Sequence, residues 1–305
     1  MGRVAFLFAG QGAQVPGMGR SFYDNCAASR KVFETADLLR PGTSQQCFEG
    51  TPEELKETKN TQPCLLTVEL AIAQALTEAG ICADVTAGFS LGELSALTYA
   101  KAFDLETGIR LVMQRGALMQ EASEQQDTSM AAVLKLSNED VEKVCAQFSQ
   151  IYPVNYNCPG QVSVSGAAAE MNDFYAAVKE AGGRALPIKV SGAFHSPFMA
   201  EAAAAFAKEL EKVEFHKPAL PIYSNFTGGQ YPEDICGILS RQIDHPVKWE
   251  MIIRAMIGAG VDTFVEIGPG TTLTGFMKKI DPSVKAINIA EYDAMQTAIE
   301  EMKSC

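Results

Sequence analysis

The sequence has few histidines, and it lacks the closely spaced cysteines that are typical of zinc sites. It contains only three histidines and one tryptophan, and its eight cysteines are scattered, with no Cys-x-x-Cys pair. Such spacing is typical of reduced thiols and not of a disulfide frame or a zinc site. We therefore expect a cytoplasmic protein with no bound metal and no bound cofactor.

Long apolar runs and an excess of positive charge are also missing. No apolar stretch approaches the roughly 20 residues that span a bilayer. The apolar residues 4–9 lead straight into a glycine-rich loop, which is typical of a buried strand and not of a signal peptide. The 25 Lys and Arg against 37 Asp and Glu give a net charge of −12, which disfavours nucleic acid and anionic membranes as partners.

The hydrophobic and charged fractions are those of a globular protein. Hydrophobic residues make up 47% of the 305 residues and charged residues 20%, which excludes disordered, collagen-like and coiled-coil proteins. Strand-like and helix-like segments alternate, and this order predicts an α/β fold with a mostly parallel sheet flanked by helices. The expected helices of the first part of the chain cover residues 21–39, 62–79, 93–100 and 105–122.

The middle of the chain has a different order of elements. After the polar segment EASEQQDT at residues 121–128, we expect a strand, a helix, two strands, a helix and a strand, ending at residue 190. This βαββαβ order is that of a ferredoxin-like unit. The sequence thus predicts a large core of residues 1–124 and 190–305 and a small ferredoxin-like insert of residues 125–189, closely packed on each other.

A candidate nucleophile lies in the sequence GFSLG at residues 88–92, which fits the pattern G-x-S-x-G. A short strand precedes this segment and a helix follows it, so Ser90 is expected on a sharp strand-to-helix turn that exposes its hydroxyl. The backbone N–H groups of that helix N-terminus would face developing negative charge. An ordinary glycine-flanked loop with a capping serine is the alternative.

Serine needs a base within hydrogen-bonding reach, and only three histidines are available. His216 lies in a charged segment and is expected on the surface, while His245 precedes a proline and is expected in an extended connector. His195 lies in a loop at the predicted domain junction, where functional side chains are often carried. It is therefore our candidate base, with a solvent-facing loop histidine as the alternative.

Two further features are consistent with acyl chemistry. The loop GQGAQ at residues 10–14 lacks the lysine of a phosphate-binding loop and the third glycine of a dinucleotide fingerprint. Such a loop after the first strand can instead offer a backbone N–H to an oxyanion, although a simple tight turn would also explain it. Arg115 lies among apolar residues of a helix, where a guanidinium could bind a carboxylate bidentately; most helical arginines are solvated.

Seven segments in order closely resemble the malonyl-CoA:acyl carrier protein transacylases, which load bacterial type II fatty acid synthesis. The resemblance covers nearly the whole chain, and the segments are GQGAQ (10–14), GFSLGE (88–93), MQRGALMQEA (113–122), VNYNCPGQVSVSG (154–166), GAFHSPFM (192–199), RQIDHPVKW (241–249) and EIGPG (266–270). It implies a hydrolase-like α/β core with a ferredoxin-like insert, in agreement with the order of elements.

The resemblance also implies roles for residues at matching positions. Ser90 would be acylated and His195 would be its general base, with the backbone N–H groups of Gln11 and Leu91 forming the oxyanion hole. Arg115 would pair with the free carboxylate of the malonyl group.

The backbone carbonyl of Gln242 would orient the histidine in place of an aspartate, as the resemblance also implies. Met119 and Asn157 match residues that line the acyl or pantetheine channel. Phe194 belongs to a GAFH segment like that of malonyl-using enzymes, in contrast to methylmalonyl-using ones. Phe89 departs from the family, which usually has histidine before the nucleophile; we expect activity to survive this change.

The implied function is transfer of malonyl from malonyl-CoA to acyl carrier protein, through an acyl-serine intermediate, by a monomer. An acidic carrier would need a local basic surface on this acidic chain, and the candidates are Arg184, Lys189, Lys278 and Lys279. Three alternatives stay open: a serine esterase or thioesterase, a non-catalytic binding protein of the same fold, and a stand-alone acyltransferase of a polyketide or polyunsaturated-lipid pathway.

Overall fold

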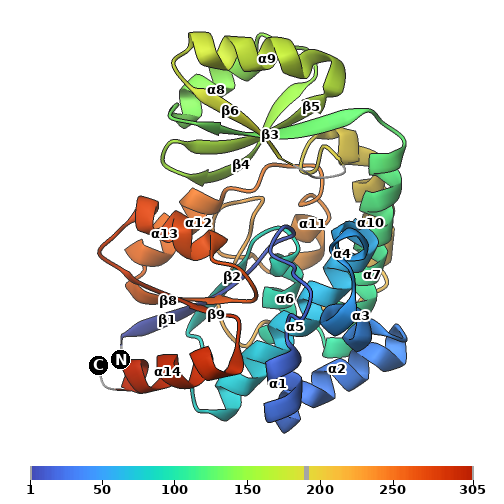
Figure 1. The fold of residues 1–305 in the computed structure, drawn as a ribbon, viewed down its shortest axis with the longest axis vertical. Helices are drawn as coiled ribbons and strands as arrows, with labels where there is room; N and C mark the ends of the chain where they lie inside the picture. Colours follow the sequence, from blue (N-terminus) through green and yellow to red (C-terminus); the bar gives the residue numbers. More distant parts are fainter. Residues whose placement is uncertain (1, 189–191, 304–305) are drawn as a thin grey trace.

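The computed structural model describes residues 2–188 and 192–303 and confirms an α/β protein with a parallel sheet flanked by helices (Figure 1). The strands are β1 (Arg3–Phe8), β2 (Val85–Gly88), β3 (Thr128–Leu134), β4 (Ile151–Cys158), β5 (Gln161–Ala167), β6 (Arg184–Ile188), β7 (Ile222–Tyr223), β8 (Val261–Ile267) and β9 (Lys285–Ile289). The helices are α1 (Arg20–Asn25), α2 (Ala27–Leu39), α3 (Thr43–Glu49), α4 (Pro52–Lys56), α5 (Thr58–Glu78), α6 (Gly92–Tyr99), α7 (Leu105–Glu124), α8 (Asn138–Cys145), α9 (Ala168–Glu180), the 3₁₀ turn η1 (Pro197–Met199), α10 (Ala200–Leu210), α11 (Ile235–Leu239), α12 (Trp249–Gly258), α13 (Thr272–Ile280) and α14 (Tyr292–Lys303).

The larger sheet has the strand order β7-β2-β1-β8-β9, and all its neighbouring pairs are parallel. Strand β1 is apolar on both faces because helices cover both. Phe6 and Phe8 belong to one buried cluster, and the alternating Ala5 and Leu7 belong to another. The loops after β1 and β2 therefore leave the sheet side by side, at the edge where parallel sheets carry their sites.

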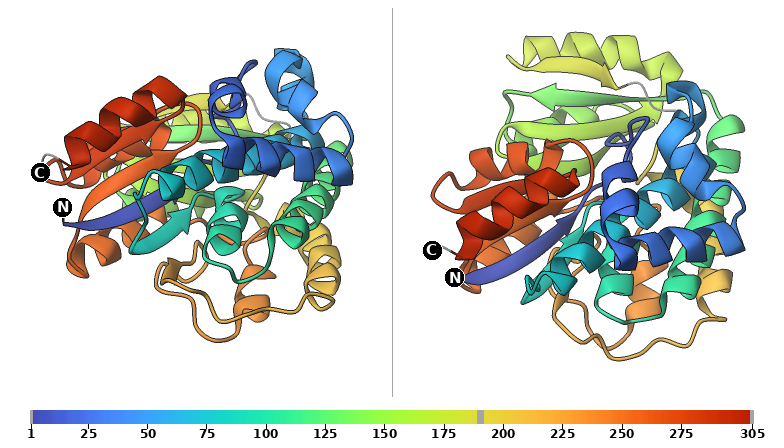
Figure 2. Two further views of the ribbon diagram at one scale, coloured as in Figure 1. Left: turned by 90° about the horizontal axis from the view of Figure 1, so that it is seen from below. Right: turned by 60° about the horizontal axis from the view of Figure 1, so that its bottom comes forward.

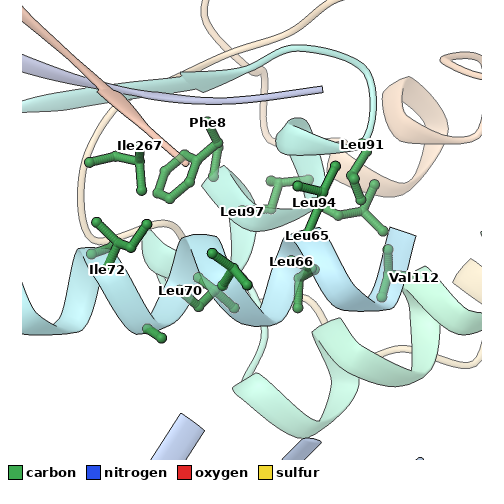
Figure 3. Packing of buried hydrophobic residues seen from close by; sticks show 14 of the residues in the cluster. Phe8, Leu65, Leu66, Leu70, Ile72, Leu91, Leu94, Leu97, Val112 and Ile267 are labelled. Atoms are coloured by element: carbon green, nitrogen blue, oxygen red, sulfur yellow. The ribbon is translucent and has the colours of Figure 1, made fainter. Parts of the chain in front are cut away.

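Helix α5 is the central helix of the main core and is buried over most of its length. Figure 3 shows Ile72 of this helix below Phe8 and Ile267 of the sheet, and Leu65 beside the α6 residues Leu94 and Leu97. A helix that is apolar around most of its circumference is stable only when it is enclosed on all sides. This packing fixes α5 and α6 relative to the loop between β2 and α6.

The smaller sheet has the strand order β4-β5-β3-β6 with antiparallel neighbours, and it contains only strands between residues 128 and 188. Helices α8 and α9 cover its outer face (Figures 1 and 2), where Val162 and Val164 of β5 are buried. The intervening residue Ser163 points to the opposite face because side chains alternate along a strand. That face is turned toward the rest of the molecule.

Backbone hydrogen bonds also join the smaller sheet to the segment before α12, which lies outside both sheets. Val247 donates its N–H to the carbonyl of Val154 at 2.8 Å and accepts from the N–H of Tyr156 at 2.9 Å. The edge strand β4 is thus paired with a segment of residues 241–249, which also holds Gln242. Residues 189–191, which connect β6 to the loop of His195, lie outside the described residues. The predicted boundary at 189/190 therefore lies outside them as well.

Some expected elements differ from those observed. The helix predicted over residues 21–39 is two helices, because Cys26 has an extended backbone and caps α2 through its sulfur. Helix α5 begins four residues before the predicted start at Gln62, and Pro63 lies inside it. The short helices α3, α4 and α11 carry too few turns to show a helical period in the sequence.

Candidate active site

Ser90 lies on a sharp turn between β2 and α6, as the G-x-S-x-G pattern predicts. A side chain at Gly88 would collide with the backbone of Gly92, and one at Gly92 would collide with the carbonyl of Phe8. Both glycines are therefore required for the close approach of strand, turn and helix. Ser90 itself has a φ of 53°, a left-handed conformation that a non-glycine residue rarely adopts.

The side chains of Ser90 and His195 meet, although 105 residues separate them in the chain. The distance between Ser90 Oγ and His195 Nε2 is 2.7 Å. The loop that carries His195 also has a left-handed backbone, with a φ of 60°, and its N–H donates to the carbonyl of Ile243 at 3.0 Å. This contact brings together the two residues that sequence reasoning paired.

Hydrogen bonds of the imidazole determine the direction of proton transfer. His195 Nδ1 lies 2.9 Å from the carbonyl oxygen of Gln242, so Nδ1–H donates to that oxygen and Nε2 is left to accept from Ser90. Burial, together with the positive charge of Arg115, lowers the pKa of His195 to about 4. The imidazole is therefore neutral, and able to accept a proton, at neutral pH.

Arg115 lies behind Ser90 and is completely buried. Its Nη2 donates to Ser90 Oγ at 3.2 Å and to Gln242 Oε1 at 2.7 Å, and its Nη1 donates to Gln62 Oε1 at 2.9 Å. Burial lowers the pKa of the guanidinium to about 10, with the charge of Glu93 opposing this shift. A charged group thus lies within reach of anything attached to the serine oxygen.

Four residues of this network were not predicted from the sequence: Gln62, Glu93, Asn225 and Tyr231. Glu93 is fully buried and accepts from Gln242 Nε2 at 2.7 Å, from the Tyr231 hydroxyl at 2.6 Å and from the N–H of Asn225 at 3.1 Å. Burial raises its pKa to about 7, against the hydrogen bonds and the charge of Arg115. The sequence does carry a signal for Glu93, because it is the only charged residue in the segment 92–99.

Asn225 braces the turn from both sides of the nucleophile. Its Oδ1 accepts from the N–H of Ser90 at 2.7 Å, and its Nδ2 donates to the carbonyl of Gly88 at 2.7 Å. Gln242 adds a third bond, because its Nε2 donates to the carbonyl of Ser90 at 2.6 Å. The strained backbone of Ser90 is therefore held by two neighbouring side chains.

A cavity of about 360 Å³ opens in front of Ser90 and His195. Gln11, Met119 and Phe194 line it, in the region where sequence reasoning placed substrate. Leu91 follows Ser90 directly, is fully buried and stands at the N-cap position of α6.

The opposite wall of the cavity comes from the smaller sheet, where every strand contributes. Among the residues on this wall is the predicted Asn157, which is 3% exposed and has a buried Oδ1 without a hydrogen-bond partner. Its Nδ2 donates to Ser163 Oγ at 3.1 Å. The alternation in QVSVSG thus places apolar side chains under α8 and α9 and polar ones toward the cavity.

The remaining predicted residues lie outside the centre of the site. His216 is exposed, and His245 is half-buried beside Asp244, so neither reaches Ser90. Phe89 packs its ring edge-on against Trp249, with centroids 5.4 Å apart, and also lines the cavity. The cations Arg184, Lys278 and Lys279 are exposed, whereas Lys189 lies outside the described residues.

Comparison with known proteins identifies the family. Residues 5–290 match the model of the acyl transferase domain. The chain belongs to the acyl transferase family. This acyltransferase is 38% identical to the malonyl CoA-acyl carrier protein transacylase of Bacillus subtilis, over 99% of this chain and 98% of that protein. It is 36% identical to the transacylase of the same name from Escherichia coli, over 98% of this chain and 100% of that protein.

Solved structures agree with this assignment. The crystal structure of the malonyl CoA-acyl carrier protein transacylase from Clostridium perfringens superimposes with a TM-score of 0.96 at 36% identity, covering 99% of the acyltransferase and 98% of that chain. A second structure is that of a type II polyketide acyl carrier protein in complex with its malonyl-transacylase. It matches with a TM-score of 0.94 at 35% identity, and the match covers 98% of this acyltransferase and 99% of that chain.

The described residues also lack a membrane-spanning helix and a metal-binding cluster. No helix in residues 2–188 and 192–303 is long and apolar enough to cross a membrane. Within the same part of the chain, no group of three or more His, Cys, Asp and Glu side chains is arranged to hold a metal ion.

Proposed function

We propose that this acyltransferase transfers the malonyl group from malonyl-CoA to the phosphopantetheine thiol of acyl carrier protein, with Ser90 as the acylated residue. The names of its relatives support the substrate and the acceptor. The observation that carries the proposal is the position of Ser90 Oγ, 2.7 Å from a neutral imidazole nitrogen and 3.2 Å from a buried guanidinium. The imidazole can assist acyl transfer in general, and the guanidinium can bind an acyl group that ends in a carboxylate.

The reaction has two symmetrical halves. In the first, Ser90 Oγ attacks the thioester carbonyl while its proton passes to His195 Nε2; the C–S bond then breaks and His195 returns the proton to the CoA thiolate. In the second half, the carrier thiol gives its proton to His195 and attacks the malonyl-serine ester, and Ser90 Oγ leaves with that proton. The carbonyl of Gln242 keeps Nε2 facing the reacting atoms throughout.

The negative charge that forms on the carbonyl oxygen of the substrate must be stabilised by hydrogen-bond donors. We assign this role to the backbone N–H groups of Leu91, at the start of α6, and of Gln11, on the loop after β1. The assignment is supported by the topology, because these two loops follow adjacent parallel strands and leave the sheet at the same edge. Loss of one such donor typically lowers the rate by about 10²–10³.

The choice of malonyl over acetyl is assigned to Arg115. A malonyl group on Ser90 has its carboxylate only two carbons from the ester oxygen, and Arg115 Nη2 is 3.2 Å from that oxygen. Burying a carboxylate without a partner is costly, and a guanidinium that is already in place removes that cost. Pairing with the carboxylate would also offset the charge that lowers the pKa of His195.

The architecture supports protection of the acyl-enzyme from water. We infer that the unit of residues 125–189 is a ferredoxin-like insert in a hydrolase-like core of residues 1–124 and 190–305, with the strand order β4-β5-β3-β6 in its favour. Its inner face forms one wall of the cavity, where Met119, Phe194 and Asn157 would contact the acyl chain or the pantetheine. We further propose a cytoplasmic monomer that needs neither metal nor cofactor.

The proposed function is tested by mixing the protein with malonyl-CoA and locating the adduct by mass spectrometry. We expect a malonyl adduct on Ser90 that persists without carrier and disappears when holo-acyl carrier protein is added, with malonyl-carrier as product. The Ser90→Ala variant should form no adduct. Rapid hydrolysis of the adduct with no transfer to the carrier thiol would instead identify a thioesterase.

A further inference from the structure

Arg115 has no carboxylate in direct contact among the described residues. Its hydrogen-bond partners are Gln62 Oε1, Gln242 Oε1 and Ser90 Oγ, which are all neutral groups. The anionic group that acts on it is Glu93, whose carboxylate is separated from the guanidinium by the side-chain amide of Gln242. The positive charge of the guanidinium is thus not neutralised by a directly bound carboxylate, and it can pair with the carboxylate of a substrate.

The amide of Gln242 has a single orientation that satisfies its neighbours. Its Nε2 faces two acceptors, Glu93 Oε2 at 2.7 Å and the carbonyl oxygen of Ser90 at 2.6 Å. Its Oε1 faces a donor, Arg115 Nη2, at 2.7 Å. The two ends of an amide have nearly the same shape, so its hydrogen-bond partners alone fix its direction. A flipped amide would present a donor to the guanidinium and an acceptor to a carboxylate.

We propose that Glu93 is a positioning residue, which fixes the side-chain amide of Gln242 so that Gln242 Oε1 holds Arg115 beside Ser90 for an acyl group that carries a carboxylate. The inference rests on the proposed malonyl transfer and adds a determinant of specificity to it. Glu93 acts at a distance, because it reaches the substrate only through Gln242 and Arg115. His195 uses the backbone carbonyl of Gln242, a different atom, so the orientation of the base does not depend on the amide.

The proposal requires the ionised form of Glu93, because only a carboxylate accepts at both oxygens. Oε1 accepts from the N–H of Asn225 and from the Tyr231 hydroxyl, and Oε2 accepts from Gln242. The titratable groups that face Glu93 are Tyr231 and Arg115; both favour its charged form, and burial opposes it. With its pKa at about 7, Glu93 takes up a proton as the pH falls below neutral, while His195 stays neutral down to about pH 4.

The first experiment compares kcat/KM for malonyl-CoA and acetyl-CoA in the Glu93→Gln variant. Glutamine has one acceptor oxygen in place of the two carboxylate oxygens of Glu93. Its NH₂ group would therefore face either the amide NH₂ of Gln242 or the donors of Asn225 and Tyr231. We expect malonyl kcat/KM to fall about 10- to 100-fold, the effect of one hydrogen bond to a charged group, and acetyl kcat/KM to fall less. Glu69→Gln is the matched control, since Glu69 is equally buried but bonds to Ser95, away from the network; its malonyl-to-acetyl ratio should equal that of the wild type.

A double-mutant cycle with Gln242→Met tests whether Glu93 acts through the amide. Methionine removes both ends of the amide and leaves the backbone carbonyl for His195. The double variant should lose no more malonyl activity than Gln242→Met alone, because the two residues act in series. Losses that multiply would overturn the proposal.

A pH profile gives a readout that a merely structural role would not move. Malonyl kcat/KM of the wild type should fall as the pH decreases through about 7. Tyr231→Phe removes a donor that lowers the pKa of Glu93, so this limb should move to higher pH; a limb that does not move would reject the role. This test stands even where Glu93→Gln fails to fold. Absence of a malonyl adduct on wild-type Ser90 would be a failure of the proposed function and not of this inference.

Discussion

At the scale of single residues, the proposed function assigns the choice of acyl group to Arg115. In Arg115→Ala, the carboxylate of a bound malonyl group would be buried without a cation, whereas an acetyl group loses nothing comparable. We expect malonyl kcat/KM to fall by about 10² or more and acetyl kcat/KM to fall much less, measured with both thioesters on the same preparation. Arg110→Ala on the exposed side of the same helix is the control. Equal losses for the two substrates would contradict the assignment.

The residues that the sequence predicted and those it did not differ in their context. Ser90, His195 and Arg115 each lie in a segment with a recognisable pattern, and the structure brings all three together. Glu93 and Gln62 could be noticed only as polar residues inside apolar helices, and no spacing rule links them to a partner 50 to 150 residues away. Their roles depend on tertiary packing, which local sequence does not encode.

At the scale of elements, the turn between β2 and α6 depends on the absence of a side chain at Gly88. A methyl group there would overlap the backbone of Gly92, so Gly88→Ala must displace the helix start and Ser90 with it. Overpacking of this kind costs about 1–3 kcal/mol of stability. We expect a lower melting temperature and at least a 10²-fold slower reaction of Ser90 with a fluorophosphonate.

A matched glycine in an open position provides the control for this substitution. Gly258 ends α12, is exposed, and has no atom near the position of an added Cβ. Gly258→Ala should leave Ser90 reactivity unchanged and raise stability by roughly 0.5–1 kcal/mol, because alanine loses less backbone freedom on folding. Equal behaviour of the two variants would show that the turn tolerates a side chain.

Elements could be predicted where hydrophobic period and length agreed. The helix predicted over residues 105–122 is α7, Leu105–Glu124, because Asp104 caps its start and its buried residues recur at the helical period. The helix expected over residues 21–39 was wrong at Cys26, where the chain leaves the helical region for one residue while the apolar period continues. Side-chain patterns report which face is buried, but they do not report such a local change of direction.

At the scale of the whole molecule, net charge determines how a partner approaches. The chain carries −12, and the resemblance implies an acidic carrier protein, so docking requires local cations. The ammonium group of Lys279 donates to Gln161 Oε1 at 3.1 Å, and Gln161 lines the cavity. One exposed positive charge is therefore in contact with a residue of the cavity wall.

Transfer to the carrier should therefore weaken as salt increases, while transfer to free pantetheine, which is uncharged, should not. Lys279→Glu should lower the rate with carrier and flatten its salt dependence. Lys208→Glu on α10 introduces the same change of charge away from the cavity and is the control. A rate with carrier that does not respond to salt would show that docking is not electrostatic.

The order of elements predicts a core and an insert, but it does not predict the position of the cavity. Its walls come from loops after β1 and β2, from α7, and from the inner face of the smaller sheet. Whether that face would cover the nucleophile depends on the pairing of Val247 with β4, a contact between segments about 90 residues apart. Pairings over such distances are decided by packing of the whole chain.

The left-handed backbone at Ser90 and His195 has a consequence for how this protein can be improved. Both positions have the conformation that glycine adopts at no cost, and other residues there lose on the order of 1–3 kcal/mol each. A search for variants that resist heat, made without regard to turnover, would favour replacing the very two side chains that react. Thermal robustness and catalysis therefore compete at these two positions, and engineering for the first must keep both fixed.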